Sequence, residues 1–152
     1  MIENKSFTKE WLDAFRLKKE HKSINVTILE KMVHALSLLE HLKLEGLDFV
    51  FKGGTSLVLL LEEGNRFSID IDIISSIERK PLETILESVI ANSHFKRHTL
   101  NERRSYKEGI PKAHYTFEFD SVYNPNVPGT ILLDILFDSA YYPELIESVV
   151  DI

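Results

Sequence analysis

The chain has 152 residues and a formal net charge of −6, which suits a single globular domain and argues against broad nonspecific adhesion to nucleic acid. The absence of cysteine excludes disulfides, zinc–thiolate sites and thiol catalysis. No apolar run is long enough for a membrane span, and the N-terminus lacks the pattern of a signal peptide, so we expect a cytoplasmic protein.

The first third of the chain predicts two helices. One is expected over residues 8–19 and a longer one over 25–43, where apolar residues recur at the spacing of one buried stripe. That stripe would consist of Ile28, Met32, Leu36 and Leu39. Gly46 suits the C-terminal end of the second helix, because glycine readily adopts the left-handed backbone found there.

The remaining elements mix strands and helices without a regular repeat. Strands are expected near Phe49, around Asp70 and Asp72, and at 95–100, 113–121 and 131–137. Helices are expected at 56–62 and 81–91, where Pro81 suits the first turn. This order favours an α+β fold in which a mixed β-sheet is flanked by helices.

Two aspartates one residue apart, Asp70 and Asp72, form the first chemical signal. Side chains i and i+2 of a strand point to the same face, so the two carboxylates share a face while Ile71 points to the other. Neighbouring carboxylates repel each other unless a positive charge lies between them. A hard divalent cation, most plausibly Mg²⁺, is the usual partner of such a pair.

A glycine turn precedes the acidic pair. Gly53 and Gly54 let the backbone approach a ligand closely, and Thr55 or Ser56 can cap a helix that starts there. The amides of a helix start bind anions such as phosphate. The turn is not a Walker P-loop, because Lys52 precedes the glycines instead of following them.

A third acid, Asp134, interrupts the apolar strand expected at 131–137. An isolated charge in such a run is costly to desolvate, and a cation shared with Asp70 and Asp72 would offset that cost. Asp138 shares the face of Asp134 and could compete for that role, and a buried acid satisfied by a backbone amide is the simpler alternative. Three acids on two strands are enough to hold the two cations of a two-metal phosphoryl-transfer site.

Two segments carry a resemblance to a known family. Lys52-Gly53-Gly54-Thr55-Ser56-Leu57, followed by Arg66-Phe67-Ser68-Ile69-Asp70-Ile71-Asp72, closely resembles the AbiEii/AbiGii toxin family of nucleotidyltransferases. That family lies within the DNA-polymerase-beta-like superfamily. The resemblance covers about residues 47–138. It implies a minimal nucleotidyltransferase fold, Mg²⁺-dependent transfer of NMP from an NTP, and a toxin role in a bacterial toxin–antitoxin or phage-defence (abortive infection) system.

The resemblance also implies roles for individual residues. Gly53, Gly54 and Thr55, with Ser56, would hold the triphosphate of the NTP. Asp70 and Asp72 would bind both metal ions, and Asp134 would complete the metal site and take the proton of the attacking hydroxyl. Arg66 and Lys52 could contact phosphate, although a structural ion pair for Arg66 and a solvent contact for Lys52 are equally open.

The chain also departs from the family pattern. No lysine or arginine follows Lys112, so the late triphosphate-binding cation of many relatives is missing. We therefore expect residues 1–152 to form one nucleotidyltransferase core domain, with N-terminal helices at 1–46 and catalytic motifs at 47–138, and without the family's C-terminal helical half. The alternatives are a small-molecule nucleotidyltransferase of the antibiotic-modifying kind and a catalytically incomplete module that binds a nucleotide or an antitoxin.

Partners are expected from charge and from the resemblance. The resemblance implies a cognate antitoxin and an RNA acceptor such as a tRNA 3′ end; a protein hydroxyl is the other macromolecular possibility. A basic cluster could meet an RNA backbone, but a solvated hairpin is the favoured interpretation. The cluster comprises Lys96, Arg97, His98, Arg103, Arg104, Lys107 and Lys112. His114 is interpreted as an ordinary strand histidine.

Overall fold

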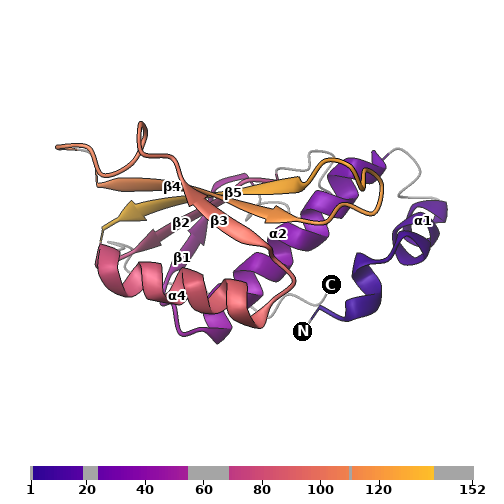
Figure 1. Cartoon of the computed structure of the whole chain (residues 1–152), viewed down its shortest axis with the longest axis horizontal. Coiled ribbons are helices and arrows are strands. Elements are labelled where there is room, and N and C mark those ends of the chain that lie inside the picture. Colours follow the sequence, from indigo (N-terminus) through magenta and orange to yellow (C-terminus); the bar gives the residue numbers. More distant parts are fainter. Residues whose placement is uncertain (1, 19–23, 55–68, 110, 139–152) are drawn as a thin grey trace.

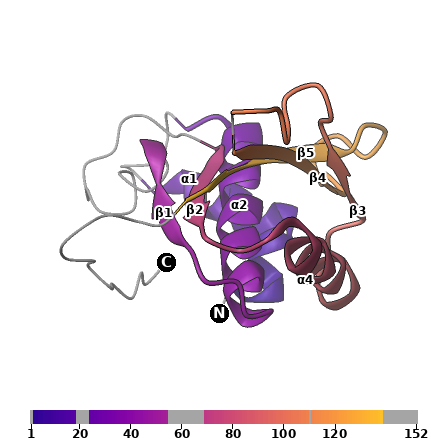
Figure 2. The same cartoon turned by 90° about the vertical axis from the view of Figure 1, so that its left-hand side faces the viewer.

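A five-stranded mixed sheet with helices packed on one face forms the fold. The computed structural model describes residues 2–18, 24–54, 69–109 and 111–138. Figure 1 shows α2 and α4 on the same side of the sheet, and Figure 2 shows the same arrangement from the side. The elements are a 3₁₀ helix at Asn4–Phe7, α1 (Lys9–Leu17), α2 (Val26–Leu44), β1 (Val50–Lys52), β2 (Ile71–Ser75), α4 (Arg79–Asn92), β3 (Arg97–Leu100), β4 (Lys112–Phe119) and β5 (Gly129–Phe137).

Local signals in the sequence set the helix ends. The Thr8 hydroxyl accepts a hydrogen bond from the Trp11 amide at the start of α1, and the Asn25 side chain accepts one from the Thr27 amide at the start of α2. Gly46, with φ of +88°, follows the end of α2 as predicted. The expected helix at 56–62 lies outside the described residues.

The strand order is β1-β2-β5-β4-β3. Among the strands of the described residues, the central β2–β5 pair alone is parallel; the β1–β2, β5–β4 and β4–β3 pairs are antiparallel. The expected α+β fold with a mixed sheet is therefore confirmed. The connection between the two central strands includes α4, β3 and β4, so residues distant in the sequence become neighbours in the middle of the sheet.

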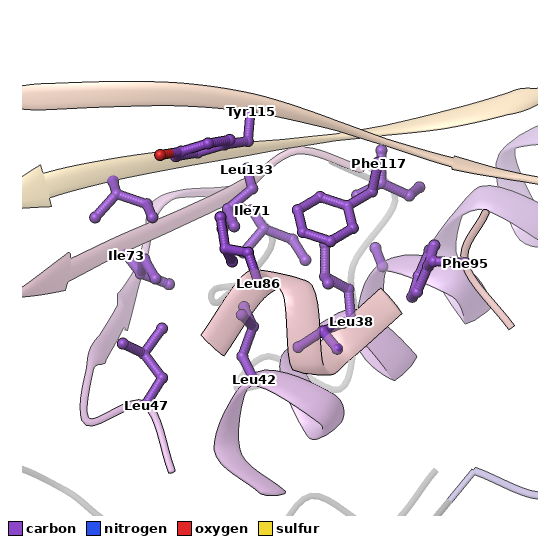
Figure 3. Close-up of a cluster of buried hydrophobic side chains, with 14 of the residues drawn as sticks. Leu38, Leu42, Leu47, Ile71, Ile73, Leu86, Phe95, Tyr115, Phe117 and Leu133 are labelled. Atoms are coloured by element: carbon purple, nitrogen blue, oxygen red, sulfur yellow. The ribbon is translucent and has the colours of Figure 1, made fainter. Parts of the chain in front are cut away.

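The hydrophobic core lies between the sheet and the helices α2 and α4. Alternate residues of each strand point into it, as the pattern of β4 predicts, and Figure 3 shows their side chains meeting those of the helices. The labelled members include Leu38, Leu42, Ile71, Ile73, Leu86, Tyr115, Phe117 and Leu133. The intervening residues of β2, β4 and β5 consequently point to the opposite face of the sheet.

The predicted stripe on α2 is only partly correct. Leu36 is buried, but Ile28 is 37% exposed, and the buried apolar residues include Leu29, Val33 and Leu38 instead. The reason is that α2 has two neighbours: α1 and the N-terminal segment on one side, and α4 and the sheet on another. A single stripe predicts one contact face, whereas this helix has a broad buried surface.

A histidine pair joins α2 to the segment after α4. The Nδ1 atom of His34 lies 2.7 Å from Nε2 of His94, and the His34 ring stacks on Phe119 with centroids 3.6 Å apart. Phe7 contacts both imidazole rings, so the pair also holds the N-terminal 3₁₀ helix. Burial lowers the pKa of His34 to about 3 and that of His94 to about 4.

These pKa values predict acid lability. The unfolded chain takes up protons near pH 6.5, but the folded chain does so only near pH 3–4, so stability falls as the pH drops below about 6.5. His34→Asn keeps a polar atom near the Nδ1 position and does not titrate. It should lower stability at pH 7.5 through loss of the ring stack, yet flatten the decline between pH 6.5 and 4.5 by up to about 1.4 kcal/mol per pH unit. Urea unfolding across that range measures the slope, and parallel slopes for both proteins would contradict the account.

Candidate functional site

Four side chains from four strands form a row across the face of the sheet opposite the core. Lys52 of β1 is paired with Asp72 of β2, Asp72 with Asp134 of β5, and Asp134 with His114 of β4. Directly paired residues on adjacent strands point to the same face, and neighbouring strands lie roughly 4.8 Å apart. The two predicted acids Asp72 and Asp134 are therefore side by side, with a lysine and a histidine at the ends of the row.

The surroundings of Asp72 disfavour its ionised form. Partial burial raises the pKa of Asp72 above its ordinary value, and the charges of Asp134 and Asp70 raise it further. Lys52 and Lys112 act in the opposite direction but do not cancel these effects. The ionised form of Asp72 is thus held at a cost, which a bound cation would reduce.

Asp70 stands immediately before β2 and is exposed. Its charge is one of the influences that raise the pKa of Asp72. Among the described residues, however, no three acidic or histidine side chains are gathered into a ready-made cation site. The carboxylates fit a hard divalent cation in ligand type and in charge, while the two-metal centre stays a prediction.

The glycine turn lies directly against Asp72. Gly53 has φ of +84°, a conformation that residues with a side chain rarely adopt. A Cβ atom at Gly53 would come within 3.1 Å of the Asp72 Cβ and closer still to Asp72 Oδ2. Glycine is therefore required at position 53 for two reasons: the backbone angle, and the space that the Asp72 carboxylate occupies.

Only some of the other predicted phosphate-binding residues belong to the described part of the chain. Lys52 is the last residue of β1, and Gly54 is exposed after Gly53. Thr55, Ser56 and Arg66 lie outside the described residues. Asp138 follows β5, and its amide donates to the Ser75 carbonyl.

His114 contacts the site, which the sequence interpretation missed. Its Nδ1 lies 2.6 Å from Asp134 Oδ1. The alternation of β4 indicated only that His114 points away from the core; the register with β5, which decides its neighbour, could not be derived from the sequence. Its position on the polar face of an alternating strand was the available signal.

The expected basic cluster divides into two groups. Lys96 forms an ion pair with Asp120 at 2.7 Å, and Arg97 forms one with Glu118 at 2.8 Å, both at the surface. The loop between β3 and β4 instead carries the exposed residues Arg103, Arg104 and Lys107. This second group adjoins the row, because Ser105 of the same loop accepts a hydrogen bond from the His114 amide at 2.9 Å.

Comparison with known proteins gives the family. The family model described as "Nucleotidyl transferase AbiEii toxin, Type IV TA system" matches residues 37–151, and the chain belongs to this family. A search of curated proteins finds no match. No helix in the described part of the chain has the length and apolar character to cross a membrane.

Two solved structures share the fold. A putative nucleotidyltransferase from H. pylori aligns with a TM-score of 0.53 and 21% identity over 78% of this chain and 52% of its own. JHP933 from Helicobacter pylori aligns with a TM-score of 0.52 and 21% identity over 78% of this chain and 50% of its own. The chain thus spans about half the length of the solved structures it resembles.

Gly53→Ala tests the contact between the turn and Asp72. Gly46→Ala is the matched control, because Gly46 also has a positive φ but has no atom within 4 Å of the added Cβ. Both substitutions should cost about 1–2 kcal/mol for the backbone conformation, and Gly53→Ala should cost about 1–3 kcal/mol more for the clash. Urea unfolding measures both losses.

An Asp72→Ala background should reduce the excess cost of Gly53→Ala, because the clashing carboxylate is then absent. Equal losses for the two glycine variants in the parent background, or an excess cost of Gly53→Ala that Asp72→Ala leaves unchanged, would show that the turn does not press on Asp72.

Proposed function

We propose that this chain is the core of a Mg²⁺-dependent nucleotidyltransferase that transfers NMP from an NTP to an acceptor hydroxyl, as the toxin of a toxin–antitoxin pair. Family membership supports the reaction class and the toxin role. The observation that carries the proposal is the placement of Asp72 beside Asp134 and against the Gly53 turn. This combination places acidic ligands beside a glycine turn of the kind that can approach a phosphate closely.

The reaction would join the acceptor oxygen to the α-phosphorus and release pyrophosphate, while the acceptor proton goes to a carboxylate. In this proposal Asp72 and Asp134, with Asp70, hold the divalent cations, and Asp134 takes the proton. When bound, Mg²⁺ would neutralise charge on the phosphates and lower the pKa of the attacking oxygen.

The flanking residues would position the NTP. Gly53, which has no side chain, lets the backbone lie directly against the Asp72 carboxylate, and Gly54 follows it as an exposed residue. The charges of Lys52 on β1 and Lys112 on β4 both act on Asp72. They would attract the triphosphate from the two sides of Asp72 and Asp134. They are the candidates for the cation that the C-terminal part of the sequence lacks.

A polyanionic acceptor is favoured by the loop between β3 and β4. Arg103, Arg104 and Lys107 are exposed on that loop, which is attached to His114 through Ser105. Cations next to a reaction centre attract a phosphate backbone, so an RNA 3′ end is the preferred acceptor over a protein or a small molecule. A cognate antitoxin, as in the family's description, is the proposed protein partner.

The catalytically incomplete module is the second candidate. The chain spans about half the length of the solved structures it resembles, so part of a catalytic apparatus could lie elsewhere. Mg²⁺-dependent NTP binding without transfer to any acceptor would favour this alternative.

A labelling assay tests the proposal. The chain is incubated with Mg²⁺, each α-labelled NTP and total tRNA, alongside Asp72→Asn and Asp134→Asn variants. We expect label on RNA in the presence of Mg²⁺ and a loss of at least about 100-fold in either variant, since each removes a charged group from the reaction centre. Unchanged labelling in both variants would contradict the proposal.

The melting temperature of Asp72→Asn shows whether a loss of labelling comes from unfolding. The raised pKa of Asp72 shows that its charge is unfavourable in the folded chain, so the neutral variant should melt at the same temperature as the parent or higher. A loss of labelling without a loss of melting temperature therefore reports on chemistry.

A further inference from the structure

His114 holds Asp134 by a short hydrogen bond within the site. Its Nδ1 and the Asp134 Oδ1 atom are 2.6 Å apart, and the residues are direct partners on β4 and β5. An ionised carboxylate can only accept, so the bond requires a proton on Nδ1. This bond occupies one oxygen of Asp134 and leaves Oδ2 available to a ligand.

His114 is itself firmly held. Its amide donates to Ser105 Oγ at 2.9 Å, its carbonyl accepts from the Asn101 amide at 2.8 Å, and β5 pairs with it on the other side. Its side chain is 15% exposed, compared with 36% for Asp134. The less exposed imidazole is thus the more constrained member of the pair and can fix the orientation of the other.

The row has a matching arrangement at its two ends. Asp72 has Lys52 as its outer neighbour, and Asp134 has His114. Lys52 acts on Asp72 through charge, whereas His114 adds a directional bond to one named oxygen. Such a bond restricts rotation of the carboxylate about its χ angles, which a flexible lysine does not achieve.

We propose that His114 is a positioning residue, which orients the Asp134 carboxylate so that Oδ2 faces the reacting groups. This inference rests on the proposed function for its catalytic consequence, although the contact between Nδ1 and Asp134 Oδ1 exists without it. His114 acts through Asp134 and does not itself touch the NTP or the acceptor.

Two substitutions of His114 separate the effect of its hydrogen bond to Asp134 from the effect of its side-chain volume. His114→Asn places an amide N–H near the position of Nδ1 and can keep the bond, whereas His114→Leu removes it. We expect kcat to fall about 10- to 100-fold in His114→Leu, with KM for the NTP within about threefold, and to recover largely in His114→Asn. Equal kcat for His114→Leu and the parent, or equal loss in the Leu and Asn variants, would overturn the proposal.

His98→Leu is the control for removal of a strand histidine. His98 lies on β3, contacts Tyr115 and Phe117, and has no hydrogen-bond partner for Nδ1 within the described part of the chain. Its kcat should match the parent's after correction for the folded fraction, which thermal melting provides.

A second measurement does not depend on activity. Nitrogen-15 NMR of the metal-free chain should show the Nδ1 of His114 protonated, and its resonance should shift in Asp134→Leu but not in Lys52→Leu. An unprotonated Nδ1, or a resonance insensitive to Asp134→Leu, would overturn the inference. Retained labelling activity in Asp72→Asn and Asp134→Asn would instead refute the proposed function and leave the NMR result standing.

Discussion

The parallel pairing of β2 with β5 is the constraint on which the site depends. It sets Asp72 opposite Asp134. The antiparallel pairs on either side place Lys52 next to Asp72 and His114 next to Asp134. A slip of one residue would move a strand's whole set of side chains to the other face, placing an acid in the core and an isoleucine or leucine in the row. The apolar residues that alternate with the acids, such as Ile71, Ile73 and Leu133, prevent that slip because all three are fully buried.

The same arrangement explains why the site is electrostatically unfavourable and still retained. The core holds β2 and β5 in place from one face, so Asp72 and Asp134 cannot separate to relieve their repulsion. The Asp72 carboxylate is partly buried, and the backbone of Gly53 lies against it. Natural proteins accept such local costs at functional sites, and a bound cation would reduce this one.

Local patterns in the sequence were sufficient for much of the fold. Apolar periodicity and Gly46 located α1 and α2 to within a few residues, and alternation in β4 identified the faces of Ala113 and Tyr115. The stripe on α2 was misassigned because periodicity alone does not reveal that a helix has two neighbours. The sequence also grouped Lys96 and Arg97 with the basic residues of the loop between β3 and β4. In the structure these two residues form ion pairs with acids at the end of β4 and just after it, which the sequence pattern could not show.

Some contacts of the site could be predicted from the sequence, whereas others could not. Asp70, Asp72 and the glycine turn are close in the chain, so their association could be predicted. His114 and Asp134 meet only through strand register, which depends on how β4 and β5 pair and not on either segment alone. The contributions of Lys52 and Lys112 to the potential at Asp72 have the same origin.

Anomalous diffraction from crystals grown with Mn²⁺ and a non-hydrolysable NTP tests the central claim most directly. The account predicts an anomalous peak bound by carboxylate oxygens of both Asp72 and Asp134, next to the Gly53 turn. A peak elsewhere, with these two carboxylates bound to protein groups alone, would contradict it.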